Sequence, residues 1–305
     1  MKKVITLSVA MMLMATLAFS QAHEAGLSLG ASNFMGDLGK RMPKGNTYFS
    51  NITASLFRPA GAAFYRYNFN KRISLRANLS YGSLEGNDAL VESKEPGSDG
   101  WFRYNRNLHF KTHIIEASVV AEVNIMPYEP GSKIDRMTPY VFGGVGLFYF
   151  NPKAVYKGEW VELQPLGTEG QGSEQYPDRE KYSLIQPSIP LGIGFKYNIN
   201  QKLSIGIEFG HRFTFTDYID DVSKTYPDKE VFDEQHDGEK AEMAKDLSNR
   251  SDEINTEGES SQITGPGKQR GNPDVNDQYM FSMISLTYNF PKQKSHFSCP
   301  SGFEY

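Results

Sequence analysis

The chain has 305 residues, with 32 Lys or Arg and 36 Asp or Glu, and its formal net charge at pH 7 is −4. A negative net charge argues against general nucleic-acid binding, which needs a positive surface. The chain contains 1 Cys, so an exported form cannot be a scaffold of internal disulfides.

The N-terminus has the pattern of a secretory signal peptide. Two lysines at positions 2 and 3 precede an apolar run at 4–19, and the small residues Ser20 and Ala22 follow it. The run is short for a membrane anchor, whereas small residues at its exit are typical of signal-peptidase cleavage. We expect residues 1–22 to be removed and residues 23–290 to form the folded domain.

Alternation of apolar and polar residues with period two is the main secondary-structure signal, and it predicts β-strands. In 73–81, for example, apolar residues at odd positions alternate with mostly polar residues at even positions. Four regular and four less regular segments give eight expected strands: 24–32, 59–69, 73–81, 115–125, 138–150, 188–198, 203–210 and 284–290. Pro139, Pro187 and Pro190 weaken two of these, because proline has no N–H to donate to a neighbouring strand.

The connections between these segments alternate in length. Short connections at 70–72, 127–136 and 200–202 are separated by long ones at about 33–58, 83–107, 151–183 and 217–277. Short periplasmic turns and long outer loops are typical of outer-membrane barrels. The sequence therefore predicts an all-β fold, an eight-stranded antiparallel transmembrane β-barrel in the cell outer membrane, with long extracellular loops and both chain ends in the periplasm.

A soluble β-sandwich or lipocalin would show the same alternation with its faces reversed. The polar face of these segments carries charges of both signs beside glycines, which suits the interior of a narrow barrel where charges must pair. Aromatic residues gather at the strand ends, as in interfacial girdles. We expect five charged side chains in the lumen: Arg76, Glu116, Glu122, Glu208 and Arg212.

The 217–277 segment is strongly acidic. It holds 17 acidic residues against 7 basic ones, a net charge of about −10. We expect a solvated outer surface, with polar stretches such as 234–242 disordered. Asp220, Asp221 and neighbouring carboxylates are candidate ligands of a divalent ion, but their spacing is not that of an EF-hand. A solvated acidic surface is the preferred interpretation.

No motif for catalysis or cofactor binding is present. The chain lacks a G-x-S-x-G elbow, an H-E-x-x-H pair, a Walker loop and a Rossmann fingerprint. His109 and His113 are four residues apart in a strand, roughly 13 Å, which is too far to share a metal ion. Glu208 and Arg212 are better explained as a buried ion pair than as catalytic groups. We expect no enzyme activity, no cofactor and no metal.

Residues 291–305 form an expected periplasmic tail beyond the last strand. That strand ends in Tyr288-Asn289-Phe290, and an aromatic-x-aromatic ending is similar to the signal read by the barrel-assembly machinery. Aromatic residues are common interface anchors, and an unpaired Cys suggests an intermolecular disulfide or a free thiol. The hypothesis is a partner-binding tail, with a disordered tail as the alternative; its candidate contact residues are Phe297, Cys299, Phe303 and Tyr305.

The run at 213–223, Phe-Thr-Phe-Thr-Asp-Tyr-Ile-Asp-Asp-Val-Ser, resembles a signature of the PorG-like barrel proteins of Bacteroidetes. Stretches at 32–39, 106–116 and 270–288 also fit that family. The most specific part of the resemblance comprises Thr216, Asp217, Tyr218, Asp220, Asp221, Val222 and Ser223.

The resemblance implies the outer-membrane barrel component of a type IX secretion system, which exports proteins. The implied partners are a periplasmic ring of a lipoprotein and its companion, together with outer-membrane lipids, and no catalytic residues are implied. The alternative is a stand-alone barrel that serves as an adhesin or stabilises the envelope, with the acidic loop as its outer binding surface.

Overall fold

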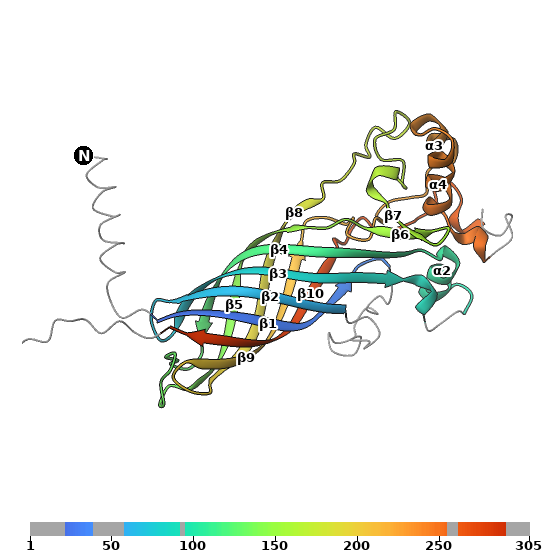
Figure 1. Ribbon diagram of the computed structural model, residues 1–305. Helices are drawn as coiled ribbons and strands as arrows, with labels where there is room; N and C mark the ends of the chain where they lie inside the picture. The colour runs from blue at the N-terminus through green and yellow to red at the C-terminus, as the bar shows by residue number, and fades with distance from the viewer. Residues whose placement is uncertain (1–21, 39–57, 92–94, 255–261, 291–305) are drawn as a thin grey trace, which may run out of the picture.

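The computed structural model describes residues 22–38, 58–91, 95–254 and 262–290. Its main body is a closed barrel of eight antiparallel strands, as predicted (Figure 1). The strands follow the order β3-β2-β1-β10-β9-β8-β5-β4, and β3 also pairs with β4 to close the sheet. Their bounds are β1 (Ala22–Met35), β2 (Arg58–Asn68), β3 (Ile73–Asn87), β4 (His109–Asn124), β5 (Met137–Tyr149), β8 (Ile185–Asn198), β9 (Leu203–Thr214) and β10 (Gln278–Asn289).

The short turns lie together at one end of the barrel. In two of them an asparagine starts the turn, and its side-chain oxygen accepts the backbone N–H groups two and three residues later. Asn70 accepts from Arg72 and Ile73 at 2.8 and 2.9 Å, and Asn200 accepts from Lys202 and Leu203 at the same distances. This side-chain turn explains why three residues suffice for each connection.

The outer face of the barrel is apolar. Leu29, Val145 and Ile284 are 75%, 68% and 66% exposed, and other large apolar side chains on the strands are similar. A closed barrel pairs its backbone groups between strands, so such a surface is stable in hydrocarbon and unstable in water. The soluble alternative is therefore wrong, because the charged face points inward.

The described part of the chain contains no helix long and apolar enough to cross a membrane.

The three prolines lie inside strands, two of them facing the lipid. The ladder between β5 and β8 runs to Gly143–Leu191 and resumes at Gly146–Ser188, so the two pairs between them are missing. The gap includes Pro190, which has no N–H to donate. The sequence-based expectation of a locally weak pairing therefore holds at this proline, while the strands themselves continue.

The long connections fold into a cap over the other end of the barrel (Figure 1). The outer cap, as used below, is the described part of 88–108, 150–184 and 215–277. It contains α2 (Asp99–Arg106), α3 (Glu230–Gln235), α4 (Glu239–Ser248), the short 3₁₀ turns η2 (Asp88–Leu90), η3 (Gln164–Leu166) and η4 (Ser251–Glu253), and the hairpin of β6 (Lys153–Tyr156) and β7 (Glu159–Glu162).

The expectation of disorder at 234–242 is wrong, because α3 and α4 occupy this stretch. Ala241, Ala244 and Leu247 lie on one side of α4 at helical spacing, and all three are buried. Small alanines among many charges give a weak apolar signal, although this spacing is that of a half-buried helix.

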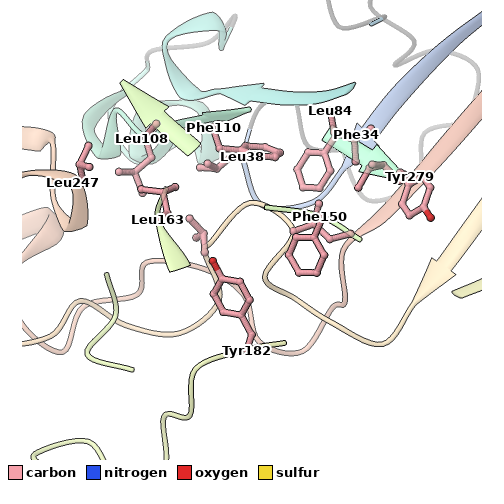
Figure 2. Close-up of a cluster of buried hydrophobic side chains, with 14 of the residues drawn as sticks. Phe34, Leu38, Leu84, Leu108, Phe110, Phe150, Leu163, Tyr182, Leu247 and Tyr279 are labelled. Atoms are coloured by element: carbon pink, nitrogen blue, oxygen red, sulfur yellow. The ribbon is translucent and has the colours of Figure 1, made fainter. Parts of the chain in front are cut away.

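The core of the cap continues into the barrel interior (Figure 2). Phe34, Phe110 and Tyr279 come from strands, and Leu163 and Leu247 come from the cap, yet they belong to one buried cluster. The interior thus changes from charged at the turn end to apolar at the cap end. The cap is a packed extension of the barrel, not a set of independent loops.

Candidate functional site: the filled lumen and the cap junction

Glu122 on β4 is the centre of the lumen charges. Arg66, Arg76 and Lys196 each place a nitrogen 2.9 Å from its carboxylate. The Nε atoms of the two arginines lie off the hydrogen-bond direction, so their contacts with Glu122 are ionic, whereas Lys196 also donates a hydrogen bond. Arg66 continues to Glu24 at 2.9 Å. One carboxylate therefore organises three cations from three other strands.

Two further contacts extend this network along the lumen. Arg76 reaches Glu208 at 2.6 Å, and the Tyr140 hydroxyl donates to the same carboxylate at 2.8 Å. Nearer the cap, Arg212 donates to both oxygens of Glu116, which also accepts from Tyr279 at 2.8 Å.

The lumen charges balance. Four cations (Arg66, Arg76, Lys196 and Arg212) face four carboxylates (Glu24, Glu116, Glu122 and Glu208). Buried charges persist only when they are paired in this way.

Glycines on the inner face make room for aromatic rings between the charges. A Cβ atom on Gly192 would lie 2.4 Å from the Phe142 ring, and one on Gly194 would lie 2.4 Å from the Tyr140 ring. The Phe142 ring in turn packs against the Arg76 guanidinium, whose carbon lies 5.3 Å from the ring centre. Side chains therefore fill the lumen, as eight strands allow.

The structure places all five predicted lumen residues inside the barrel, but it pairs two of them differently. Glu208 and Arg212 do not pair with each other, because four residues along a strand separate them by roughly 13 Å. Each instead binds a side chain from across the barrel, Arg76 and Glu116 respectively. Sequence reasoning missed Glu24 and Arg66, although both stand at inward positions of expected strands, Arg66 between Tyr65 and Tyr67.

The family-like residues at 216–223 meet the other loops at one place, the cap junction, which comprises Glu169, Asp220, Asp221, Arg270 and Asp277. Glu169 is fully buried and accepts from the backbone N–H groups of Ser223 and Lys224 at 2.9 and 3.0 Å. Arg270 donates to it at 3.1 Å. One carboxylate from the 151–183 loop thus fixes the end of the 216–223 run.

Asp220 and Asp277 also bind backbone groups. The Asp220 carboxylate accepts from Leu38 N–H at 2.9 Å and from Val222 N–H at 3.0 Å. Asp277, just before β10, accepts from Ile219 N–H at 2.9 Å. These bonds replace the inter-strand ladder that loops lack, because buried N–H groups need an acceptor.

Asp221 has a left-handed backbone, with φ of 67°, and a fully buried side chain. Its carboxylate accepts from the hydroxyls of Thr168 and Tyr182, the latter at 2.7 Å, while its carbonyl accepts from Arg270. Asp tolerates this conformation better than most residues.

Arg106, at the end of α2, joins two further loops to the junction. It binds both oxygens of Asp88, at 2.7 and 2.9 Å, and donates to the carbonyls of Arg270 and Asp37 at 2.6 and 2.8 Å. The stretches around 37, 106 and 270 are the other parts of the sequence that resemble the PorG-like family. In this structure the hydrogen bonds of Arg106 connect the three stretches to one another.

Other residues of the 216–223 run make packing contacts or accept a backbone hydrogen bond. Tyr218 stacks on Tyr182 with ring centres 4.8 Å apart and 9° between the planes. Val222 is buried in the cap core. The Thr216 hydroxyl accepts from Tyr218 N–H at 3.2 Å.

Burial changes the acidity of the junction carboxylates. It raises the pKa of Asp221 to about 6, although Arg270 nearby favours the charged form. Burial, with the charge of Asp220 beside it, raises the pKa of Asp217 to about 9. Both oxygens of Asp217 are buried, and the Ser223 side chain beside them only partly favours the charged form. Burial likewise raises the pKa of Asp220 and of Asp277, which lie close to each other.

The expectation of a solvated acidic surface is therefore wrong for 217–221 and Asp277, whose carboxylates are buried. Among the described residues, no three His, Cys, Asp or Glu side chains are placed to share a metal ion. His109 accepts from Val155 N–H at 3.0 Å, whereas His113 lies 2.8 Å from the Tyr81 hydroxyl. The two histidines thus serve different contacts.

The signal-peptide prediction falls on residues 1–22, of which only Ala22 is described. The tail candidates Phe297, Cys299, Phe303 and Tyr305 also lie outside the described residues.

A closed eight-stranded barrel with a paired charged interior and an apolar exterior is a transmembrane β-barrel. The chain belongs to the family described as "Domain of unknown function (DUF6089)", whose model matches residues 2–241. No curated protein matches the sequence.

Three solved structures are similar to the chain in outline. They are the N-terminal β-barrel domain of Pseudomonas aeruginosa OprF (8% identity, 89% of this chain and 98% of that chain, TM-score 0.34), the Yersinia pestis attachment invasion locus protein Ail (10%, 89% and 98%, 0.35) and Neisserial surface protein A (9%, 88% and 97%, 0.34). Scores this low carry no argument about what this chain binds.

Proposed function

We propose that the protein is a non-enzymatic outer-membrane subunit of the type IX secretion machinery, which anchors or contacts a periplasmic ring of a lipoprotein and its partner. The observation that carries the structural part of this proposal is the filled lumen, where four cations and four carboxylates pair inside the barrel. A barrel whose lumen is filled has no open path for solutes, so we expect it to act through contacts at its two ends. The resemblance at 216–223 supports the assignment to this secretion system.

Within this proposal, the periplasmic contact includes the tail at 291–305. Phe297, Phe303 and Tyr305 supply aromatic anchors, and Cys299 supplies either a free thiol or an intermolecular disulfide. The last described strand, β10, ends at Asn289 beside Glu24, at the turn end of the barrel. A segment that follows this strand starts on the side where a periplasmic partner would be.

The test is co-purification from solubilised outer membranes. The full chain should bring down a periplasmic lipoprotein, and deletion of 291–305 should release it while the barrel remains inserted and heat-modifiable. Non-reducing gels of intact cells should show a heavier species that Cys299→Ser abolishes if the thiol forms a disulfide. If the full chain brings down no periplasmic component, the subunit role is lost. If the deletion variant retains it in full, only the tail's part in docking is lost.

Conductance tests the structural role separately. In planar bilayers the purified barrel should form no stable channel of porin size, because paired side chains fill the lumen. Stable conductance would contradict an anchoring role for a closed barrel.

The second candidate is an adhesin or envelope-stabilising barrel, favoured by the folded acidic cap. Glu230, Glu234 and Glu239 on α3 and α4 are exposed, so the cap presents negative charge outward. Deleting α3 and α4 should abolish binding to cells or matrix under this alternative, but should leave a periplasmic partner bound under the first proposal.

A further inference from the structure

Two neighbouring turns at the turn end of the barrel enclose a groove of about 740 Å³. One is the 125–136 connection between β4 and β5, and the other is the 199–202 connection between β8 and β9. Gly131, with φ of 75°, lies so close to the second turn that a Cβ atom there would be 2.6 Å from the Gln201 carbonyl oxygen. The longer turn therefore rests on the shorter one, and the groove lies between them.

Three cations line this groove: Lys133, Arg136 and Lys202. The two lysines are exposed, and their ammonium groups have no carboxylate partner within the described part of the chain. The two acids of the longer turn are already engaged, since Lys71 binds Glu129 at 3.0 Å and Asp135 at 2.7 Å. Lys71 balances one of these two carboxylates, so the three cations of the groove still outnumber the remaining acid and leave a net positive charge.

The Arg136 guanidinium has a fixed position. Its carbon lies 5.0 Å from the centre of the Tyr197 ring, and Nη2 donates to the Asn198 carbonyl at 3.3 Å. Tyr197 pairs with Ile205, which is 43% exposed on the lipid-facing side of β9. Arg136 is thus held against the outer face of the barrel and leaves donors free for an anion, which guanidinium groups bind through several N–H bonds at once.

The other lining of the groove is apolar and joins the lipid-facing belt. Ile199 and Tyr288 are 44% and 40% exposed, and Leu203 pairs directly with Tyr288. At the tip of the longer turn Ile134 is 92% exposed beside Lys133. Cations above an apolar strip that leads into the hydrocarbon fit a ligand with an anionic head and an acyl chain.

We propose that this groove binds an anionic phospholipid of the leaflet at the turn end, with the phosphate between Lys133, Arg136 and Lys202 and the acyl chain along Ile199, Leu203 and Tyr288. A basic side chain near such a surface adds favourable binding energy. The site is independent of any secretion role, because it needs only the barrel and its turns. A soluble phosphate or an acidic protein surface would use the cations but not the apolar strip.

The experiment is native mass spectrometry of the full-length protein in detergent, titrated with dioleoyl phosphatidylglycerol or dioleoyl phosphatidylcholine. The test variant is K133Q/R136Q/K202Q. The control, K157Q/K229Q/K240Q, removes the same charge from exposed positions on the cap. Wild type and control should retain phosphatidylglycerol at the same concentration, whereas the test variant should need about a hundredfold more. Phosphatidylcholine should bind all three proteins equally.

Three results would overturn the proposal. The test variant binds phosphatidylglycerol as well as wild type does; millimolar inorganic phosphate displaces the lipid completely; or the test variant keeps the lipid but loses an acidic protein that co-purifies with wild type. If the triple variant does not insert, K133Q and K202Q replace it, because neither ammonium group makes a hydrogen bond or ion pair within the described part of the chain. Each alone should weaken phosphatidylglycerol binding several-fold, and unchanged binding in both would reject the site.

Discussion

The lumen and the outer cap both bury carboxylates, but they use them differently. In the lumen, Glu116 and Glu122 bind side chains of other strands. In the cap, Glu169, Asp220 and Asp277 bind backbone N–H groups of other loops. Strands already satisfy their backbone through the sheet, so their side chains are free to pair with one another. Loops lack a ladder, and buried carboxylates take its place.

This difference predicts that the two regions fail separately. Loss of a lumen charge should weaken the whole barrel, because the network joins strands that are not neighbours: Arg76 of β3 binds Glu208 of β9, and Lys196 of β8 binds Glu122 of β4. Loss of a junction carboxylate should open the cap and leave the barrel intact. The chain allows both to be followed, since its 2 tryptophans, Trp101 and Trp160, lie in α2 and β7 of the cap. Tryptophan emission therefore reports the cap, and heat-modifiability on gels reports the barrel.

Glu122→Gln should have the largest effect. It leaves Arg66, Arg76 and Lys196 without their shared counter-charge, and breaking a buried ion pair costs about 3–5 kcal/mol. Urea unfolding of the protein in lipid vesicles, scored by loss of the heat-modifiable band, measures it. Glu162→Gln, which removes an exposed ion pair with Lys153, should change stability by less than about 1 kcal/mol. Equal unfolding midpoints for the two variants would show that the lumen pairs do not hold the barrel.

Val119→Arg tests the other face of the same strand. Val119 is 45% exposed near the middle of β4, and Arg at a mid-bilayer position facing lipid costs roughly 2–4 kcal/mol. Val119→Leu keeps the face apolar and should behave as wild type. The measurement is the urea midpoint in vesicles, and it applies equally to Ile207→Arg on β9. An arginine variant that assembles and resists urea like wild type would mean that this face is not in lipid.

Glu169→Gln should act on the cap alone. The amide replaces a charged acceptor of two backbone N–H groups and removes the partner of Arg270, at a cost of about 2–3 kcal/mol. Tryptophan emission should shift at lower urea while the barrel stays heat-modifiable. Asp178→Asn, which breaks an exposed contact with Lys224, is the control. A simultaneous loss of cap and barrel would contradict the separation of the two regions.

The sequence predicted the barrel well and the cap poorly, for a physical reason visible in β4 and β10. In the part of each strand that crosses the bilayer, the apolar residues face outward. This part begins at Ile115 in β4 and at Ile284 in β10. Nearer the cap the pattern reverses, with Phe110, Ile114 and Phe281 buried inside. The alternation with apolar residues outward ends at this reversal, so the predicted strands were six residues too short at the cap end. The reversal marks where the interior changes from charged to apolar.

The cap junction could not be predicted from pattern, because its bonds join a side chain to backbone groups far away in sequence. Glu169 is one carboxylate in a loop without a motif, and its partners follow more than fifty residues later. Counting charges in 217–277 assigned Asp220 and Asp221 to solvent, whereas the fold buries them. The residues that resemble the PorG-like family were detected, but their role in joining the loops required the structure.

Asp217→Asn should have the smallest effect at low pH, and the difference in cap stability between variant and wild type should grow as pH rises. The pKa of Asp217 is about 9 in the folded protein and 3.8 for an exposed Asp. Between these values the folded state holds a proton that the unfolded state lacks, so the free energy of unfolding falls as pH rises, by at most about 1.4 kcal/mol per pH unit. Asn resembles the protonated acid but cannot ionise.

At pH 5, about one pH unit above the ordinary pKa of Asp, the cap of the variant and that of wild type should differ in stability by no more than about 2 kcal/mol. At pH 8 the variant should be the more stable of the two, because wild type must keep Asp217 protonated against the solvent. Tryptophan emission in urea titrations at pH 5, 6, 7 and 8 measures the difference. The barrel band should show no such divergence, since Asp217 lies in the cap. Parallel curves for wild type and variant across this range would mean that Asp217 is ionised in the folded cap.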